Sequence, residues 1–98
     1  MTINKEKNGN ELLLKISERL DTTTAPQLDE TLEGALEGID MLSFDFSELE
    51  YLSSAGLRSL LSAQKKMSSQ GSMIIKNVNE MINEIFEVTG FSDILTIE

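Results

Sequence analysis

The chain has 98 residues with 17 acidic and eight basic side chains, no histidine and no cysteine, so its formal net charge is −9. The missing histidine and cysteine exclude Ser-His and Cys-His nucleophilic catalysis and the usual zinc sites. The negative charge repels nucleic acid and anionic lipid, so we expect direct contact with neither nucleic acid nor a membrane. A polar amino-terminus and the lack of an apolar run of about 18 residues predict a cytoplasmic protein. The length predicts one domain, residues 1–98.

The first third of the chain predicts a hairpin and a helix. The region around Ile3 and the apolar residues 10–16 are separated by Asn8-Gly9-Asn10, which is typical of a turn between antiparallel strands. Thr24-Ala25-Pro26-Gln27 has the form of a capping box with proline in the first turn. Apolar residues then recur at helical spacing. We expect this helix to run to about Gly38.

The middle of the chain predicts a buried strand. Residues 41–46 are largely apolar rather than alternating, which favours a short strand covered on both faces. Asp45 is expected at the carboxyl end of that strand. Residues 45–48, Asp-Phe-Ser-Glu, have the composition of a turn and are expected to form an acidic turn ahead of the next helix.

Apolar residues recur at helical spacing from Leu57 to Met67, which predicts a second helix. Two adjacent serines, Ser53 and Ser54, lie at its start. Either serine is a natural N-cap, whose oxygen accepts a hydrogen bond from a free backbone N–H and stabilises the helix by about 1 kcal/mol. Gly56 lies in the first turn, where we expect the missing side chain to leave the backbone open to approach. The segment thus places hydroxyl groups at a helix start.

The last third predicts a strand, a helix and a final strand. Residues 72–76 form a short apolar run. Asn77 or Asn79 would cap a helix that ends at Gly90, and residues 94–97 would form a terminal strand. With right-handed crossovers, this element order predicts an α/β fold in which a mixed sheet packs against helices.

Two segments of the chain resemble the STAS domain of anti-sigma factor antagonists. One is Arg19-Leu20-Asp21-Thr22-Thr23-Thr24-Ala25, and the other runs from Phe44-Asp45-Phe46-Ser47 through Tyr51-Leu52-Ser53-Ser54-Ala55-Gly56-Leu57. The likeness extends over essentially the whole chain in length and element order. It implies a STAS-like mixed sheet of about four to five strands, with about three to four helices packed mainly on one face.

The resemblance implies a protein that is acted upon rather than an enzyme. In that family, a small domain binds an ATP-using anti-sigma factor serine kinase and displaces the sigma factor. The kinase then phosphorylates a serine at the start of the second helix, the partners separate, and a PP2C-type phosphatase would restore the serine. The position two residues before Gly56 assigns this role to Ser54, with Ser53 as the competing acceptor. The family often has Asp at position 53 and Ser or Thr at position 55, where this chain has Ala.

The partner-binding residues implied by the resemblance lie before the first helix, along the central strand and at the start of the second helix: Asp21, Thr22, Asp45, Ser47, Tyr51, Ser53, Ala55, Gly56 and Arg58. No cofactor is expected, since the chain has no Gly-x-x-x-x-Gly-Lys loop and ATP would be bound by the partner. We expect a monomer or weak dimer. From the residues alone, Ser54 is an N-cap, Asp21 a turn former and Asp45 a strand-end carboxylate.

Two other functions stay open. The domain could be a non-phosphorylated interaction subunit of a lipid-transport ABC complex, in which case Ser54 would be structural. It could also be a nucleotide-binding sensor, although it has no recognisable phosphate loop. A pull-down separates the first two functions, because one predicts a GHKL-type kinase and the other an ATPase subunit. Titration with GTP and ATP tests the third.

Overall fold

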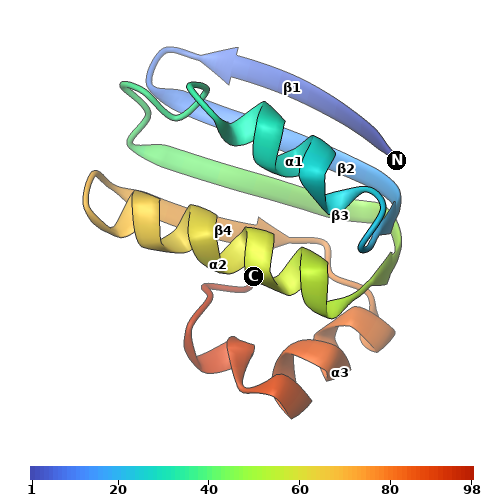
Figure 1. Ribbon diagram of the computed structural model, residues 1–98. Helices are drawn as coiled ribbons and strands as arrows, with labels where there is room; N and C mark the ends of the chain where they lie inside the picture. The colour runs from blue at the N-terminus through green and yellow to red at the C-terminus, as the bar shows by residue number, and fades with distance from the viewer.

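A hairpin followed by alternating helices and strands builds a mixed α/β fold. The computed structural model describes residues 1–98 and contains β1 (Thr2–Asn8), β2 (Glu11–Leu20), α1 (Ala25–Leu32), β3 (Met41–Leu52), α2 (Ser54–Ser68), β4 (Ser72–Lys76), α3 (Glu80–Thr89) and the 3-10 helix η1 (Phe91–Asp93). Figure 1 shows α1 and α2 lying over one face of the sheet, with α3 on the β4 side. The predicted fold class is confirmed.

The four strands lie in the order β1-β2-β3-β4, which is also their order in the chain. β1 is antiparallel to β2, and the other neighbours are parallel, with α1 and α2 in the crossovers. The predicted hairpin is confirmed. Gly9 in its turn has a φ of 67°, which a glycine adopts without strain.

The core lies between the sheet and the helices, as one cluster of 24 buried apolar residues. β3 supplies every second residue of its first half to this core, namely Leu42, Phe44 and Phe46. The residues between them are only half-buried and lie on the face opposite to the helices. The prediction that this strand is covered on both faces is therefore wrong, because α1 and α2 cover one face only.

The first helix is shorter than its sequence pattern suggests. α1 ends at Leu32, and the chain then turns instead of continuing as a helix to Gly38. Gly34 and Gly38 have φ values of 79° and 78°, in the left-handed region that interrupts a helix. Leu36 and Ile39 are still buried, so the apolar spacing reflects core packing of a turn segment.

The carboxyl-terminal third agrees with the predicted strand and helix but not with the final strand. Asn79 caps α3, since its Oδ1 accepts a hydrogen bond of 2.8 Å from the backbone N–H of Ile82. Gly90, with a φ of 81°, ends this helix. After η1 only Ile97 pairs with the sheet, through a parallel bridge to Ile75. None of the helices combines the length and apolar character needed to span a membrane.

Candidate functional site

The ends of β2 and β3 meet the start of α2 at one end of the sheet (Figure 1). β3 runs to Leu52, so residues 45–48 lie in a strand and the acidic turn predicted there is wrong. Leu20 and Leu52 are register partners, and the backbone N–H of Ser53 donates to the carbonyl oxygen of Leu20 at 3.0 Å. This bond ties the entry of α2 to the end of β2.

An irregular pairing with β2 explains why β3 continues past the predicted turn. The register shifts twice near the end of β2, where Glu18 has a φ of 71°. A bulge of this kind changes which face the following side chains occupy. The buried positions of β3 accordingly change from every second residue to every third, at Phe46, Leu49 and Leu52. The second half of β3 therefore lacks the alternation of buried and exposed residues that is typical of a strand, and its sequence resembles that of a turn.

The two adjacent serines differ in exposure. Ser54 is exposed and is the first residue of α2, whereas Ser53 is the N-cap. The Ser53 Oγ is buried, makes no capping hydrogen bond and has no other partner. The predicted side-chain cap is therefore wrong for both serines. Of the two, only Ser54 is an exposed residue, and it lies at a helix start whose free N–H groups favour negative charge.

Ala55 and Gly56 face the interior. Ala55 is 8% exposed, and Gly56 is buried. A Cβ on Gly56 would lie 2.6 Å from Leu52 Cδ1 and 2.8 Å from Leu20 Cγ, which is closer than packed atoms come. The expectation that Gly56 leaves the backbone open to approach is wrong. Its missing side chain lets α2 lie close to the ends of β2 and β3.

Asp21 organises the loop between β2 and α1. Its Oδ1 accepts hydrogen bonds from the backbone N–H groups of Thr23 and Thr24, at 3.0 and 3.2 Å. The Thr24 hydroxyl donates to the carbonyl oxygen of Arg19 and does not cap α1, so the predicted capping box is wrong. Burial acts to raise the pKa of Asp21, but hydrogen bonds from Thr24, Thr23 and Arg19 outweigh it and lower the pKa overall. Thr22 is exposed at the tip of this loop.

Arg19 connects that loop to the end of β3. Its Nε lies 3.3 Å from Asp21 Oδ2, and its guanidinium lies 4.2 Å from the centroid of the Tyr51 ring, a cation–π contact. Arg19 and Tyr51 are register partners on β2 and β3. We call Asp21, Arg19 and Tyr51 the Arg19 cluster. The predicted contact residues did not include Arg19, and only the pairing register of the two strands would have revealed it.

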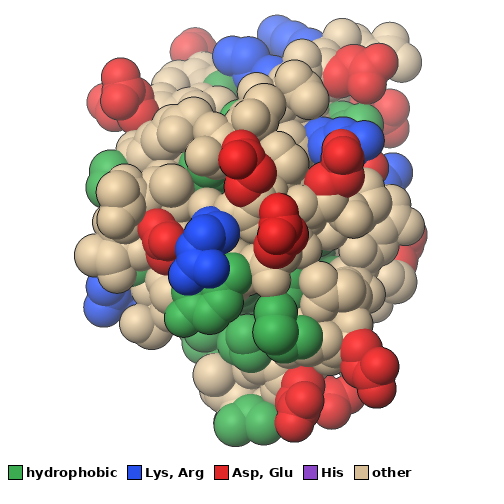
Figure 2. Space-filling view, turned by 90° about the vertical axis from the view of Figure 1, so that its right-hand side faces the viewer, with side chains coloured by type: hydrophobic (Ala, Val, Ile, Leu, Met, Phe, Trp, Pro, Cys, Tyr) green, Lys and Arg blue, Asp and Glu red, His purple; other side chains and the backbone are tan.

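A shallow hollow lies between the starts of α1 and α2, with a volume of about 240 Å³. Arg58 lines it and is exposed, and the three ion pairs of the structure all involve other residues. Figure 2 faces this end of the molecule and shows single basic side chains among several acidic ones, with hydrophobic side chains gathered below them. The hollow is lined by Thr22, Ala25, Pro26, Asp29, Ala55, Arg58, Ser59 and Ser62.

Asp45 and Ser47 lie away from Ser54 and the start of α2. Asp45 is inside β3, and the remaining strand to Leu52 covers on the order of 20 Å, so its predicted place at the strand end is wrong. Its Oδ1 accepts hydrogen bonds of 2.9 Å from the Ser47 N–H and from Asn77 Nδ2. Burial acts to raise the pKa of Asp45, yet these bonds and the charge of Lys15 lower it overall.

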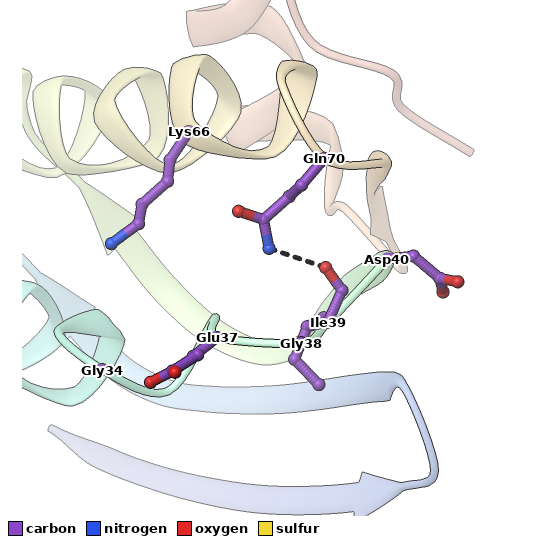
Figure 3. Close-up of a pocket in the computed structure, with 7 residues that line it drawn as sticks. All are labelled: Gly34, Glu37, Gly38, Ile39, Asp40, Lys66 and Gln70. Carbon is purple, nitrogen blue, oxygen red and sulfur yellow. Dashed lines mark hydrogen bonds between the residues drawn. The ribbon is translucent and has the colours of Figure 1, made fainter.

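A larger hollow of about 570 Å³ lies at the other end of α2 (Figure 3). There Gln70 Nε2 donates to the carbonyl oxygens of Leu36 and Ile39, at 2.6 and 2.7 Å. These bonds hold the connection between α1 and β3 against the end of α2, which is a structural role. No group of three or more His, Cys, Asp or Glu side chains in the structure is arranged to hold a metal ion.

Comparison with known proteins agrees with this architecture. The family model for the STAS domain matches residues 2–98, so the chain belongs to the STAS domain family, as its two segments predicted. It is 31% identical over 97 residues to the anti-sigma-B factor antagonist of Listeria monocytogenes, covering 96% of this chain and 84% of that protein.

Two solved structures share the fold. An anti-sigma factor antagonist from Mycobacterium paratuberculosis superposes with a TM-score of 0.88 at 21% identity, covering 98% of this chain and 83% of that one. The Bacillus cell fate determinant SpoIIAA in its phosphorylated form superposes with a TM-score of 0.78 at 15% identity, covering 99% and 91%. At these identities the likeness establishes the fold alone.

Proposed function

We propose that this protein is an anti-sigma factor antagonist that binds an anti-sigma factor serine kinase and is switched off when the kinase phosphorylates Ser54. The observation that carries the proposal is the contrast between the exposed Ser54 and the buried Oγ of Ser53 at the start of α2. The sequence likeness to a named antagonist over almost the whole chain supports the class.

In this proposal the chain is the substrate of phosphoryl transfer. The Ser54 Oγ bonds to the γ-phosphorus of ATP, the bond between that phosphorus and ADP breaks, and the hydroxyl proton goes to a base of the kinase. A serine of ordinary acidity needs such a base, and the chain has no phosphate-cradling loop of its own. The kinase therefore supplies ATP, magnesium and the base. A PP2C-type phosphatase resets the switch by hydrolysing the phosphoserine.

The proposed contact surface surrounds Ser54 and consists of the Arg19 cluster together with Thr22 and Arg58. Ser53, Ala55 and Gly56 support this surface from inside, while Asp45 and Ser47 contribute to strand and loop structure elsewhere. Phosphorylation adds about −1.5 to −2 charges at pH 7. The helix start tolerates this charge, so the domain stays folded. A closely packed partner meets added bulk and negative charge, which promotes release.

The direct test is phosphate mapping. The kinase is co-purified with the tagged protein, the complex is incubated with Mg-ATP, and the phosphorylated residue is located by mass spectrometry. We expect phosphate on Ser54 in the wild type and in Ser53→Ala, and none in Ser54→Ala. Phosphate on Ser53, or on neither serine, would contradict the proposal.

A further inference from the structure

Arg58 follows Ser54 by one turn of α2, and both residues are exposed. Side chains four residues apart on a helix are neighbours, with about 5 to 6 Å between their Cβ atoms. An anion placed four residues before a cation is the favourable order for such a pair. A phosphate on Ser54 would therefore lie within reach of the Arg58 guanidinium without any movement of the backbone.

The Arg58 guanidinium is uncommitted in the unphosphorylated protein. It forms no ion pair, and Asp29, which lines the same hollow, is not paired with it. Arg19, the other arginine of this surface, is held by the Tyr51 ring and the Asp21 carboxylate. Arg58 is thus the cation of this surface that is free to accept a new anionic partner.

We propose that Arg58 pairs with the phosphate of phosphoserine 54 within the same chain, an inference that rests on the proposed phosphorylation of Ser54. A guanidinium binds phosphate through two parallel N–H···O bonds, which neutral side chains cannot match. Phosphorylation then changes the surface twice: it adds negative charge, and it withdraws the free cation that a partner had met. Release of the kinase follows from both changes.

The test uses protein in which phosphoserine is introduced at position 54 during translation, so no kinase is needed. The protonation of the phosphate is followed by ³¹P NMR in the wild type, in Arg58→Gln and in Lys65→Gln. Lys65 is the matched control, because it is exposed on the same helix and carries the same charge. It lies about 16 Å from Ser54 along the helix axis. Circular dichroism checks that each variant is folded.

We expect the titration midpoint of the phosphate to rise by roughly 0.3 pH unit in Arg58→Gln, because loss of the guanidinium disfavours the dianion. Lys65→Gln should titrate like the wild type, and high salt should reduce the difference. Equal midpoints for wild type and Arg58→Gln, or an equal shift in Lys65→Gln, would overturn the pairing. Failure of the kinase to phosphorylate Ser54 would instead overturn the proposed function and leave this measurement intact.

Discussion

The two ends of α2 use their polar groups in opposite ways. At the carboxyl end, Gln70 donates to two backbone carbonyl oxygens, and Gly71 packs against the backbone of Asp40. At the amino end, Ser54 and Arg58 are exposed, and their side chains have no partner in the protein. The larger hollow therefore lies where the fold satisfies its own groups, and the smaller one lies beside exposed groups that have no partner within the chain. The size of a hollow and the presence of unpartnered polar groups thus point to opposite ends of α2.

The strongest way to test this contrast is to add a methyl group at the glycine beside each end of α2. A Cβ on Gly71 would lie 2.0 Å from the carbonyl oxygen of Asp40, which is backbone and cannot turn away. On Gly56 a Cβ would lie 2.6 Å from Leu52 Cδ1 and 2.9 Å from the carbonyl oxygen of Leu20, which is a smaller overlap. We expect Gly71→Ala to lower the free energy of unfolding by about 3 kcal/mol, and Gly56→Ala by about 1 to 2 kcal/mol. Urea denaturation measures both, and a larger loss for Gly56→Ala would contradict the packing described.

A charge at the amino end should act on binding instead of stability. We expect Ser54→Asp to weaken binding of the kinase about 10- to 100-fold, since like charges are brought together in a close interface. Ser54→Ala should bind as the wild type does and stay bound when Mg-ATP is added. Isothermal titration calorimetry gives the affinities. Equal affinities for the two variants would show that charge at position 54 does not control release.

A substitution at the carboxyl end of α2 should change the stability of the protein and leave phosphorylation of Ser54 unchanged. Gln70→Ala removes one donor from the carbonyl oxygen of Leu36, which still accepts from the Ile39 N–H, and removes the side-chain donor of the Ile39 carbonyl oxygen. We therefore expect a loss of about 1 to 2 kcal/mol in the free energy of unfolding. Phosphorylation of Ser54 in the folded variant should proceed at the wild-type rate. Thermal unfolding and a phosphorylation time course provide the two readouts. A slowed time course in fully folded protein would mean that the two ends of α2 are coupled.

The smallest expected effect is on how the free energy of unfolding depends on pH in acid. The folded-state pKa values of Asp21 and Asp45 lie below their ordinary value of 3.8. A depressed pKa contributes stability above the unfolded pKa, and this contribution is lost as the pH falls below about 4. Asp45→Asn should therefore make the free energy of unfolding less dependent on pH between about 4 and 2. Urea titrations across this range test it, with Asp29→Asn as an exposed control; an unchanged slope would contradict the hydrogen-bonded role of Asp45.

Local patterns predicted the kind of almost every element but not how far each one extends. The hairpin and α3 are governed by residues at their own ends, such as Gly9 and Asn79, so the sequence is sufficient there. The length of β3 depends on its neighbours: β4 pairs with it only as far as Asp45, and β2 alone accompanies it further. The strand therefore continues past the point where its apolar run and its pairing with β4 both stop.

The candidate site could likewise be predicted from the sequence only in part. The serine pair and its place at a helix start could be read from a contiguous segment, because capping and helix periodicity are local. Which serine is accessible depends on how tightly α2 approaches the sheet at Gly56, and the contact between Arg19 and Tyr51 depends on strand register. These are tertiary properties, and no spacing within either segment encodes them.

The buried, neutral hydroxyl of Ser53 has a consequence for fidelity among parallel signalling pathways. A kinase adapted to an antagonist with an aspartate at that position would offer a complementary cation or donor. Docked on this chain, such a kinase would leave that group unpaired, at a cost of about 1 to 3 kcal/mol. The side chain beside the proposed phosphorylation site would thereby insulate this antagonist from such a kinase.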